Sequence, residues 1–527
     1  MSENSGTQEK PQQPQEKQQK QPKQGKQQGK QQGKQGKQGK PQQPKQEKKQ
    51  KLSSQNASLT FNIPKSNFTD WYDELMVTAG IVDKDHWDTK GMPIFLPYGY
   101  YMHNAIMHLF EEEYNGIGIR QCQFPAFIPK SFLTREAEHV KGFESECFWH
   151  EDKMCLRPTS ETAMYSMFHL WVQSEEDLPL MVHQTCNVYR YETKNTKPLI
   201  RVREIPWNEA HTAHATPEDA KKTLDDFWAI VHRVFTDRLS IDGLRLRRPD
   251  WDRFPGAEYT DVLDVVMPCG RVLQSIGCHY LGQHFSKVFD IQVNGENSYM
   301  TCIGVSTRAL AAVLSMHGDN DGLVLPSVIA PYQIIIVPIL GKKPEPEMVA
   351  KLDEMKQKLT DAGFRVRVDM NPQKRPGEKY YFYQMKGVPL RIDFGNRDLQ
   401  NNKFVLVTRA LDGKRECNLD DLVPICQEAL KAYDDALKER AQAHLQSRIV
   451  DVDDINKIAE VLQQGGFARI PYFTMGKEGA EGAERIHDLC NAEIRGYQPL
   501  EQQPGEGVKC IVTGKPAKYY AYVARSY

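Results

Sequence analysis

The sequence predicts an α+β protein in which a polar tail precedes three folded units. From residue 67 to about 330, runs of β-branched and apolar residues outnumber the helices that could connect parallel strands, which indicates an antiparallel sheet surrounded by helices. At Pro331 the pattern changes to a fully apolar strand followed by an amphipathic helix, which indicates a second, α/β domain. A charged helical stretch then leads to a glycine-rich module that ends at Tyr527.

The first 57 residues consist almost entirely of Gln, Lys, Pro and Gly. Residues 1–51 carry thirteen Lys and four Glu, whereas the whole chain has a formal net charge of -1, so a basic tail precedes an acidic body. Such a segment buries too little apolar surface to offset the entropy of ordering, and we expect a disordered coil. Two interpretations remain open: a polycation that contacts RNA non-specifically, or a solubilising tail without a partner.

The composition also indicates in which cellular compartment the protein acts. The chain has no apolar run of the roughly 18–20 residues that a spanning helix needs, and its first residues lack the apolar core of a secretory signal. Its eleven Cys are odd in number, scattered and never spaced as CxxC. This pattern is typical of reduced thiols in a cytoplasmic enzyme and argues against a disulfide framework.

Apolar periodicity gives the elements of each unit in order. In the body it predicts helices over 70–79, 101–114 and 302–315, with strands over 120–128, 182–192, 199–205, 261–267 and 271–276. In the second unit it predicts strands over 333–340, 365–369, 388–394 and 404–410 and a helix over 349–362, and further helices are expected over 425–448 and 450–465.

The densest chemistry lies between residues 156 and 214. Predicted strands over 188–192 and 199–205, joined by a short basic loop, form a hairpin. Because side chains on a strand alternate, Arg190 and Glu192 share one face, and so do Arg201, Arg203 and Ile205. Convergent arginines suit a triphosphate, since burying unpaired guanidinium groups is costly. Spacing alone leaves a solvated, salt-bridged hairpin equally open.

Several fragments resemble the motifs of class II aminoacyl-tRNA synthetases. Arg190-x-Glu192 and Arg201-x-x-x-Ile205 are similar to motif 2, the run from Gly304 through Arg308 to motif 3, and the segment with Pro125 to motif 1. Within that class, the sequence resembles prolyl-tRNA synthetases of the archaeal and eukaryotic type over about residues 65–527. The fragments that carry this resemblance are LRPTSET, RVREIPWNEAHTAH, LGQHFSKVFDI and KGVPLRIDFGNRDL.

This resemblance implies a domain order and an activity. It implies an antiparallel catalytic domain over 58–330, an anticodon-binding α/β domain over 331–425, a small α/β C-terminal module over 426–527 and a homodimer. The activity would be ATP-dependent attachment of L-proline to tRNA(Pro) through prolyl-adenylate, with Mg²⁺ accompanying ATP. Two alternatives remain: a catalytically inactive, tRNA-binding paralogue, or a class II synthetase for another amino acid such as threonine or glycine.

The resemblance also implies a role for individual residues. Arg190 would hold the α-phosphate and the proline carboxylate, and Glu192 would orient the adenine amino group or a metal-bound water. Arg201 would reach the β- and γ-phosphates, and Arg308 would stack on adenine opposite Ile205. The remaining residues implied are Thr159, Glu161 and His279 for proline, and Gln274 and Ser306 for the nucleotide.

The chain departs from the family pattern at several positions. Ile205 stands where the class prefers Phe, and Gly277 where relatives often carry Thr. Of four zinc-binding cysteines in the C-terminal module of many relatives, only Cys510 is present, so structural zinc is not expected. His211 and His214 raise a zinc site as an alternative, but no Cys or Glu is expected to complete it. About 95 residues separate His211 from Arg308, too few for an inserted editing domain.

The second domain combines basic and aromatic residues. As a bare pattern this is more often a solvated basic face, but the resemblance to an anticodon-binding domain favours contact with the unstacked bases of an anticodon loop. The basic residues are Arg365, Arg367, Lys374, Arg375, Lys379, Arg391 and Arg397, and the aromatic ones are Tyr380, Tyr381 and Phe382.

Overall fold

A computed structural model describes residues 61–135, 146–192, 195–340, 345–411 and 413–527. The predicted coil over 1–57 lies outside these residues. Within them the chain forms three sheets of four strands or more, and each has its own hydrophobic cluster.

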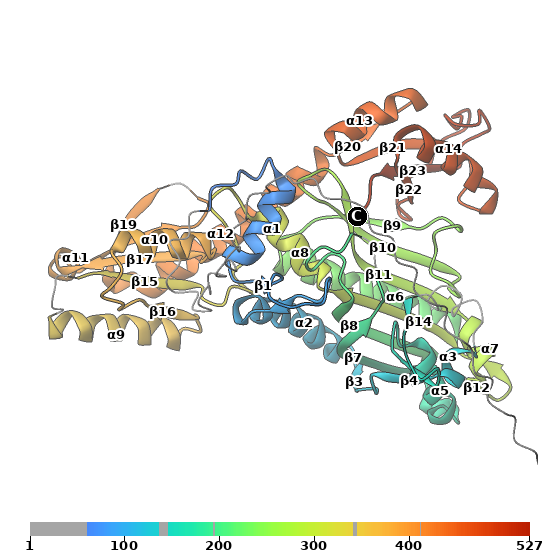
Figure 1. Ribbon diagram of the computed structural model, residues 1–527, viewed down its shortest axis with the longest axis horizontal. Helices are drawn as coiled ribbons and strands as arrows, with labels where there is room; N and C mark the ends of the chain where they lie inside the picture. The colour runs from blue at the N-terminus through green and yellow to red at the C-terminus, as the bar shows by residue number, and fades with distance from the viewer. Residues whose placement is uncertain (1–60, 136–145, 193–194, 341–344, 412) are drawn as a thin grey trace, which may run out of the picture. The chain divides into compact units, whose positions relative to one another are not determined.

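The largest sheet has seven strands in the order β3-β7-β8-β14-β11-β10-β9 (Figure 1). Only the edge pair β3–β7 is parallel, and every other pair is antiparallel, as the sequence predicts. The strands are β3 (Arg120–Gln121), β7 (Leu180–Tyr189), β8 (Glu204–His214), β9 (Leu244–Arg247), β10 (Tyr259–Val266), β11 (Val272–Gly282) and β14 (Tyr299–Ser306).

Alternation along the central strands separates the two faces of this sheet. Ile276 and Cys278 of β11 and Ile303 and Val305 of β14 join the main hydrophobic cluster, to which α6 (Pro217–Val231) also contributes. The residues between them face the opposite side, where smaller or polar side chains leave a cavity.

The other helices and strands of the body are α1 (Phe68–Thr78), α2 (Pro97–Gly116), α3 (Lys130–Leu133), α5 (Glu161–Trp171), α7 (His284–Phe289), α8 (Arg308–His317), β1 (Val82–Asp83), β2 (Ile94–Phe95), β4 (Phe127–Pro129), β5 (Phe148–His150), β6 (Met154–Leu156), β12 (Gln292–Val293) and β13 (Glu296–Asn297).

The second unit is a five-stranded mixed sheet in the order β16-β15-β17-β18-β19. Alternation again assigns its faces: Ile334 and Ile336 pack with α9 and α12, whereas Ile335 and Val337 pack with Tyr383 of α10. Its elements are β15 (Ile334–Ile339), α9 (Pro346–Asp361), β16 (Val366–Val368), α10 (Pro376–Met385), β17 (Leu390–Gly395), α11 (Asn396–Gln400), β18 (Lys403–Thr408), β19 (Lys414–Asn418) and α12 (Leu422–Gln446).

The C-terminal module is a four-stranded sheet in the order β20-β21-β23-β22 with two helices. The expected boundary between residues 425 and 426 falls inside α12, whose first turns pack in the second unit and whose Leu445 packs against β9 and β10. The module's elements are β20 (Ile449–Asp451), α13 (Ile458–Gln464), β21 (Phe467–Tyr472), α14 (Ala480–Cys490), β22 (Glu493–Gly496) and β23 (Tyr519–Ala524).

Three predicted elements are wrong in part. The predicted strand over 120–128 is two short strands in different sheets, β3 and β4, because Pro125 interrupts it. The predicted helix over 302–315 begins only at Arg308, since Thr301, Ile303 and Val305 continue strand β14. The predicted helix over 450–465 is strand β20 followed by the shorter helix α13.

The predicted hairpin is also wrong in its limits. Strand β7 ends at Tyr189 and β8 begins at Glu204, so Arg190, Glu192, Arg201 and Arg203 lie in the connection and not on strand faces. Pro198 has no N–H to donate, and Leu199 turns into the core with a φ of +63°, so a strand cannot pass through this point.

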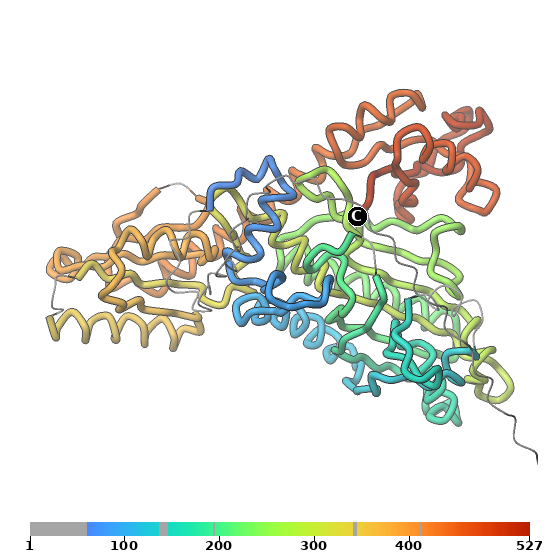
Figure 2. The backbone as a smooth tube through the Cα atoms, viewed as in Figure 1, coloured from blue at the N-terminus to red at the C-terminus, as the bar shows by residue number. Residues whose placement is uncertain are grey.

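The segment between His211 and Arg308 belongs wholly to the body. It forms the end of β8, helix α6, strands β9, β10, β11 and β14 and the short elements between them. The trace in Figure 2 follows it from green to yellow-green through the large sheet and its covering helices. No separate domain is inserted in this segment, all of which lies within the described range 195–340.

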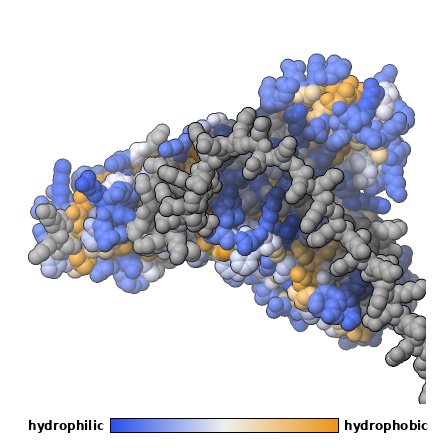
Figure 3. Space-filling model, in the orientation of Figure 1, coloured by the Kyte–Doolittle hydropathy of each residue, from blue (hydrophilic) through white to orange (hydrophobic). Residues whose placement is uncertain are grey.

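On the face seen in Figure 3, hydrophilic side chains cover most of the visible surface of the described residues, and hydrophobic ones gather in smaller patches. None of the helices formed by the described residues is both long enough and apolar enough to cross a membrane.

Candidate active site

A cavity of about 400 Å³ opens on the face of the large sheet opposite α6. Its floor comes from alternate residues of three neighbouring strands, β8, β14 and β11. At Gly304 that floor is bare backbone, because a Cβ added there would meet no atom within 4 Å. All ten predicted site residues line this cavity: Thr159, Glu161, Arg190, Glu192, Arg201, Ile205, Gln274, His279, Ser306 and Arg308.

Arg190 enters the cavity from the connection that follows β7. Its Nε donates to the carbonyl oxygen of Pro158 at 3.1 Å, and its guanidinium lies 5.9 Å from the centre of the Trp207 ring. Burial lowers the pKa of Arg190, although the charges of Glu146, Glu161 and Glu209 oppose this. The backbone contact fixes the orientation of a planar fork, the group that binds two oxygens of a carboxylate or phosphate side by side.

Arg201 and Glu192 form an ion pair at the mouth of the cavity, with 3.1 Å between Nη1 and Oε2. A second nitrogen of Arg201 donates to the main-chain oxygen of Tyr527 at 3.2 Å, so a residue of the C-terminal module reaches the rim of the site. The side chain of Arg201 is 38 % exposed, which suits a group that meets the outer phosphates of a ligand.

Arg308 is the first residue of α8, directly after β14. Its Nε donates to the carbonyl oxygen of Ile200 at 2.9 Å and its Nη1 to that of Gln274 at 3.3 Å. Burial, followed by the positive charges of Arg201, Arg190 and Arg495, lowers the pKa of Arg308 to about 10. Three arginines therefore repel one another across one cavity, and a polyanion that bound there would relieve this repulsion.

Thr159 and Glu161 lie where the chain enters α5. The hydroxyl of Thr159 donates to the Glu161 carboxylate, which is buried. The amide of Gln184 on β7 bridges Ser160 and Glu209, and so ties this turn to the sheet. The result is a fixed carboxylate at the inner end of the cavity, which suits a small cationic group.

Sequence reasoning missed several residues of the same wall: Trp207, Glu209 and Phe254, with His211 considered only as a metal ligand. His211 contacts the hydroxyl of Tyr165 at 2.8 Å and Glu209 at 3.2 Å. Trp207, Glu209 and His211 follow Ile205 at steps of two on β8, and this alternation is a signal that could have found them.

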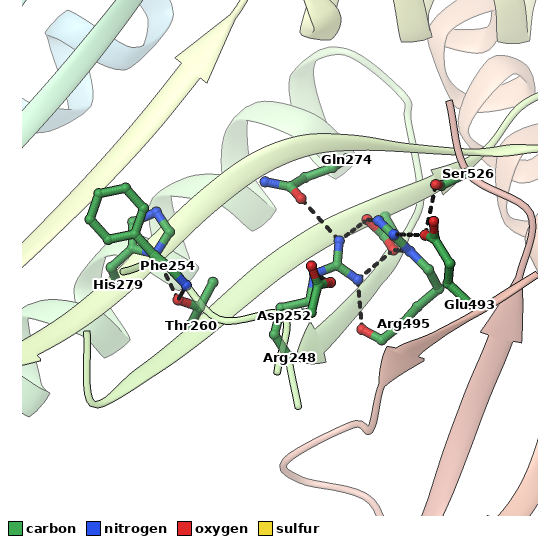
Figure 4. A network of polar contacts seen from close by, with 10 residues as sticks. Arg248, Asp252, Phe254, Thr260, Gln274, His279, Glu493, Arg495 and Ser526 are labelled. Carbon is green, nitrogen blue, oxygen red and sulfur yellow. Dashed lines mark hydrogen bonds and ion pairs between the residues drawn. The ribbon is translucent and has the colours of Figure 1, made fainter. Parts of the chain in front are cut away.

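His279 occupies the far side of this inner pocket. It contacts the hydroxyl of Thr260 at 2.9 Å, and its ring centre lies 4.5 Å from that of Phe254 (Figure 4). Burial, reinforced by the charge of His211, lowers the pKa of His279 to about 3, so the ring is neutral at pH 7. Together with Phe254 and Trp207 it gives the pocket largely apolar walls.

The expectation that no Cys or Glu would accompany His211 is wrong. Glu161, His211 and Cys302 each offer a donor atom, and the three atoms lie within 4.8 Å of one another. His214 lies on the opposite face of β8 and bonds to Thr212. Both ring nitrogens of His211 are already engaged by Tyr165 and Glu209, and burial raises the pKa of the Cys302 thiol, so this group is a poor metal site as it stands.

Three family models match most of the described chain. The tRNA synthetase class II core domain (G, H, P, S and T) matches residues 143–317, an anticodon binding domain matches residues 333–429, and the C-terminal domain of prolyl-tRNA synthetase matches residues 455–527. The proline–tRNA ligase of Methanosarcina mazei is 42% identical over 478 residues, which cover 88% of this chain and 98% of that protein. The chain belongs to the prolyl-tRNA synthetase family.

Solved structures of the family agree in fold. Giardia lamblia prolyl-tRNA synthetase in complex with prolyl-adenylate has a TM-score of 0.86 and 46% identity, covering 89% of this chain and 100% of that one. The enzyme from Cryptosporidium parvum, complexed with halofuginone and AMPPNP, has a TM-score of 0.85 and 28% identity, covering 90% and 98%. The family resemblance and the class II fold inferred from the motifs are thus confirmed.

The basic residues of the anticodon-binding domain divide into two groups. Lys379 and Arg365 donate to the backbone oxygens of Asp369 and Ala330, and Arg391 pairs with Asp393, so these three serve the domain's own packing. Arg375 and Arg397 are exposed and remain available to a partner. Three of the seven basic residues expected from the sequence are therefore less suited to contact RNA than the two exposed ones.

The buried Glu209–His211 pair predicts a pH effect on stability. Burial disfavours the imidazolium, but the hydrogen bond and charge of Glu209 raise the pKa of His211 above 6.5. A raised pKa contributes stability that is complete below pH 6.5 and is lost as the pH rises through the folded value. We expect the melting temperature of the unsubstituted protein to fall by about 1–2 °C more than that of a His211→Gln variant between pH 6 and 9. Parallel pH profiles for the two proteins would contradict this.

Proposed function

We propose that this protein attaches L-proline to tRNA(Pro), using ATP and passing through prolyl-adenylate. The observation that carries the proposal is the convergence of three arginines, a fixed carboxylate and an apolar inner pocket on one cavity in a member of this family. A synthetase for another amino acid loses support, because the relatives compared are proline–tRNA ligases. An inactive paralogue would have no physical need for clustered buried arginines.

The first step is an in-line substitution at phosphorus. A carboxylate oxygen of proline attacks the α-phosphorus of ATP, the bond to the β-phosphate oxygen breaks, and pyrophosphate leaves. Arg190 holds the α-phosphate and the proline carboxylate, and Arg201 holds the outer phosphates. The protein forms no covalent bond, so catalysis rests on positioning and on fixed positive charge.

The second step transfers the prolyl group. The 3′-hydroxyl of the terminal adenosine of tRNA attacks the carbonyl carbon of the adenylate, and AMP leaves. Arg190 stays beside the phosphate that departs, and Arg308 holds the adenine against Ile205. Ile205 offers an apolar plate without π-stacking, which weakens the adenine contact by about 1 kcal/mol or less relative to Phe.

Proline is held by its ring and its charged nitrogen. Glu161, with Thr159 bonded to it, accepts hydrogen bonds from the secondary ammonium. The ring lies among Phe254, His279 and Trp207, whose flat rings give this end of the cavity largely apolar walls. Glu209 is paired with His211 at 3.2 Å, and we assign to Glu161 the contact with the ammonium.

Mg²⁺ accompanies ATP in this proposal. The donor set fits: Glu192 presents carboxylate oxygens beside the phosphate-binding Arg201, and hard oxygen ligands are what Mg²⁺ prefers. Bound there, the ion would neutralise charge on the outer phosphates. Ser306 and Gln274 contact the nucleotide from the adjoining strands β14 and β11.

The direct test is charging of tRNA. Purified protein, ATP, Mg²⁺ and labelled proline are incubated with tRNA(Pro) or with tRNA for another amino acid. We expect labelled prolyl-tRNA with tRNA(Pro) alone. Charging with threonine or glycine instead of proline, or no charging with any of the three, would contradict the proposal.

We also propose an oligomeric state and a compartment for this protein, and that it does not edit mischarged tRNA. The second domain extends past residue 425 into the first turns of α12. Two chains associate as a homodimer, and the protein acts in the cytoplasm. Because residues 211–308 complete the large sheet, the chain has no site in this segment for hydrolysing mischarged tRNA. Alanine and cysteine differ from proline by a methylene or two, so we expect misactivation and no hydrolysis of alanyl-tRNA by this chain.

The C-terminal module does not fit structural zinc. Cys510 is buried in an apolar cluster, and the positions that correspond to the first two ligands are Phe473 and about Gly482. The ammonium of Lys515 lies 4.9 Å from the centre of the Phe473 ring, where a second cation would be repelled. We expect elemental analysis to find well below one zinc per chain and EDTA to leave the melting temperature unchanged. One tightly bound zinc per chain would overturn this.

The tail is proposed to contact RNA without sequence preference. Removing residues 1–57 deletes a strongly basic segment, so the affinity for tRNA should fall by about tenfold at low salt and the slope of log K against log salt should become shallower. Affinity is measured from 50 to 200 mM KCl, with a tRNA of another specificity as a control for sequence preference. An unchanged affinity and slope would favour a tail that only keeps the protein soluble.

A further inference from the structure

Both the backbone and the side chain of Gln274 accept a hydrogen bond from an arginine. Its backbone oxygen accepts from Arg308 Nη1 at 3.3 Å, and its side-chain oxygen accepts from Arg248 Nη2 at 3.0 Å. A guanidinium can only donate, so the contact with Arg248 determines which way the amide faces. Figure 4 shows the amide nitrogen of Gln274 on the side away from Arg248, and Gln274 lines the cavity. The amide therefore offers the cavity a donor.

Arg248 itself is held by a buried carboxylate. It follows β9 and donates to both oxygens of Asp264 on β10, at 3.2 and 3.1 Å. Asp264 is also the cross-strand neighbour of Gln274. Burial opposes the charge of Asp264, but Arg248 and Arg495 together hold the pKa of this carboxyl below its usual range. The pair lies in the interior, where solvent does not screen it.

The second arginine on Asp264 comes from the C-terminal module. Arg495 on β22 donates from Nε to Asp264 Oδ2 at 2.9 Å, and its carbonyl oxygen accepts from Arg248 Nη1 at 2.6 Å. Glu493, which accepts from Ser526, pairs with the outer edge of Arg495 at 2.8 Å (Figure 4). Arg495 thus contacts both Asp264 and Arg248. It does not line the cavity itself, and Arg248 links it to Gln274, which does.

Backbone pairing fixes the module at this place. The N–H of Arg247 donates to the oxygen of Tyr497 and the N–H of Tyr497 to the oxygen of Arg247, so the module extends the edge strand β9. Gly496 permits the approach, because a Cβ there would lie 2.1 Å from the oxygen of Arg247. Val272, at the start of β11, donates to the oxygen of Arg525. The module is therefore hydrogen-bonded to both β9 and β11, on either side of the buried charges of Asp264, Arg248 and Arg495.

We propose that Arg495 is a positioning residue for the nucleotide site: through Asp264 and Arg248 it holds the Gln274 amide with its donor toward ATP. The proposal rests on the proposed function for the identity of the ligand. It makes the C-terminal module part of the adenylate-forming site, in addition to any role that the module has in stability. Without Arg495, Asp264 draws Arg248 toward itself and the Gln274 amide is free to turn over.

The test is an Arg495→Met variant, read out first by the Kd for AMPPNP in calorimetry. This readout does not depend on catalysis, so it separates the relay from the proposed activity. We expect the Kd for AMPPNP to rise about fivefold to tenfold. In ATP–pyrophosphate exchange the KM for ATP should rise by a similar factor, and the KM for proline should change less than twofold. Arg495→Lys, which keeps a charge beside Asp264 without the fork, should fall between the two.

Two controls distinguish positioning from general loss of structure. Arg469→Met removes a guanidinium that pairs with Asp451 and Glu501 and lies over the ring of Tyr520, all in the same module, and it should leave the Kd for AMPPNP unchanged. Combining Arg495→Met with Gln274→Ala should add nothing to the effect of Gln274→Ala alone. If Arg495→Met does not fold, Arg495→Lys carries the same comparison.

Equal AMPPNP affinities for Arg495→Met and the unsubstituted protein would overturn the relay, as would independent, multiplying effects of Arg495→Met and Gln274→Ala. Loss of proline-dependent exchange in the unsubstituted protein would instead contradict the proposed function, and the calorimetric comparison would still decide the relay.

Discussion

Replacing Arg190 by lysine should lower kcat/KM for proline-dependent ATP–pyrophosphate exchange by about 10²–10³-fold. Lysine keeps the positive charge but not the planar fork that can hold an α-phosphate oxygen and a carboxylate oxygen together. It also lacks the Nε that donates to Pro158, so the ammonium has no fixed position in the cavity. Because both substrates meet this side chain in the proposed function, we expect kcat to fall together with affinity for proline and ATP.

Arg203→Lys is the matched control. Arg203 lies in the same connection between β7 and β8, but its guanidinium bonds to the backbone oxygen of Glu192 and does not line the cavity. We expect less than a threefold change in kcat/KM. Equal effects of the two substitutions would mean that the connection as a whole, and not the Arg190 fork, supports the reaction.

Arg308→Ala should raise the KM for ATP by about 10²-fold and lower kcat as well. The substitution removes the side chain that we propose to stack on adenine and also frees the backbone oxygens of Ile200 and Gln274 that it holds. The KM for proline should change little, since the proposed role of Arg308 concerns the nucleotide alone. Initial rates of exchange at varied ATP and varied proline separate the two effects.

Removal of Arg308 also relieves repulsion from Arg190 and Arg201, so the free protein should not lose stability in proportion to the lost activity. Arg233→Ala, which removes a surface arginine paired with Glu113, serves as the control and should leave both KM values unchanged. A KM for ATP that stays within threefold after Arg308→Ala would exclude the assigned role.

The fold could be predicted where residue patterns are local. The antiparallel order followed from β-branched runs without crossover helices, and β15 and α9 followed from apolar periodicity. Helix α10 was missed because its aromatic residues suggested an exposed RNA-binding surface, whereas Tyr383 packs against the sheet. Strand β19 was missed because it is polar and lies at the sheet edge, where charged side chains replace apolar alternation.

The site could be predicted as a set of residues but not as a geometry. The motifs gave ten residues, all of which line the cavity, although the arginines sit on loops and a helix start and not on strand faces. Phe254 carried no signal, since it lies in the connection between β9 and β10 and reaches His279 only through folding. The contacts among Gln274, Arg248, Asp264 and Arg495 join residues up to 247 positions apart, which no local pattern indicates.

The most direct measurement of the central claim is ATP–pyrophosphate exchange with a panel of amino acids, including proline, threonine, glycine, alanine and cysteine, in the absence of tRNA. The account predicts rapid exchange with proline, exchange with alanine and cysteine that is weaker by a factor of about 10–200 in kcat/KM, and none with threonine or glycine. Exchange that requires threonine or glycine, or no exchange with any amino acid, would contradict adenylate formation by these arginines around proline.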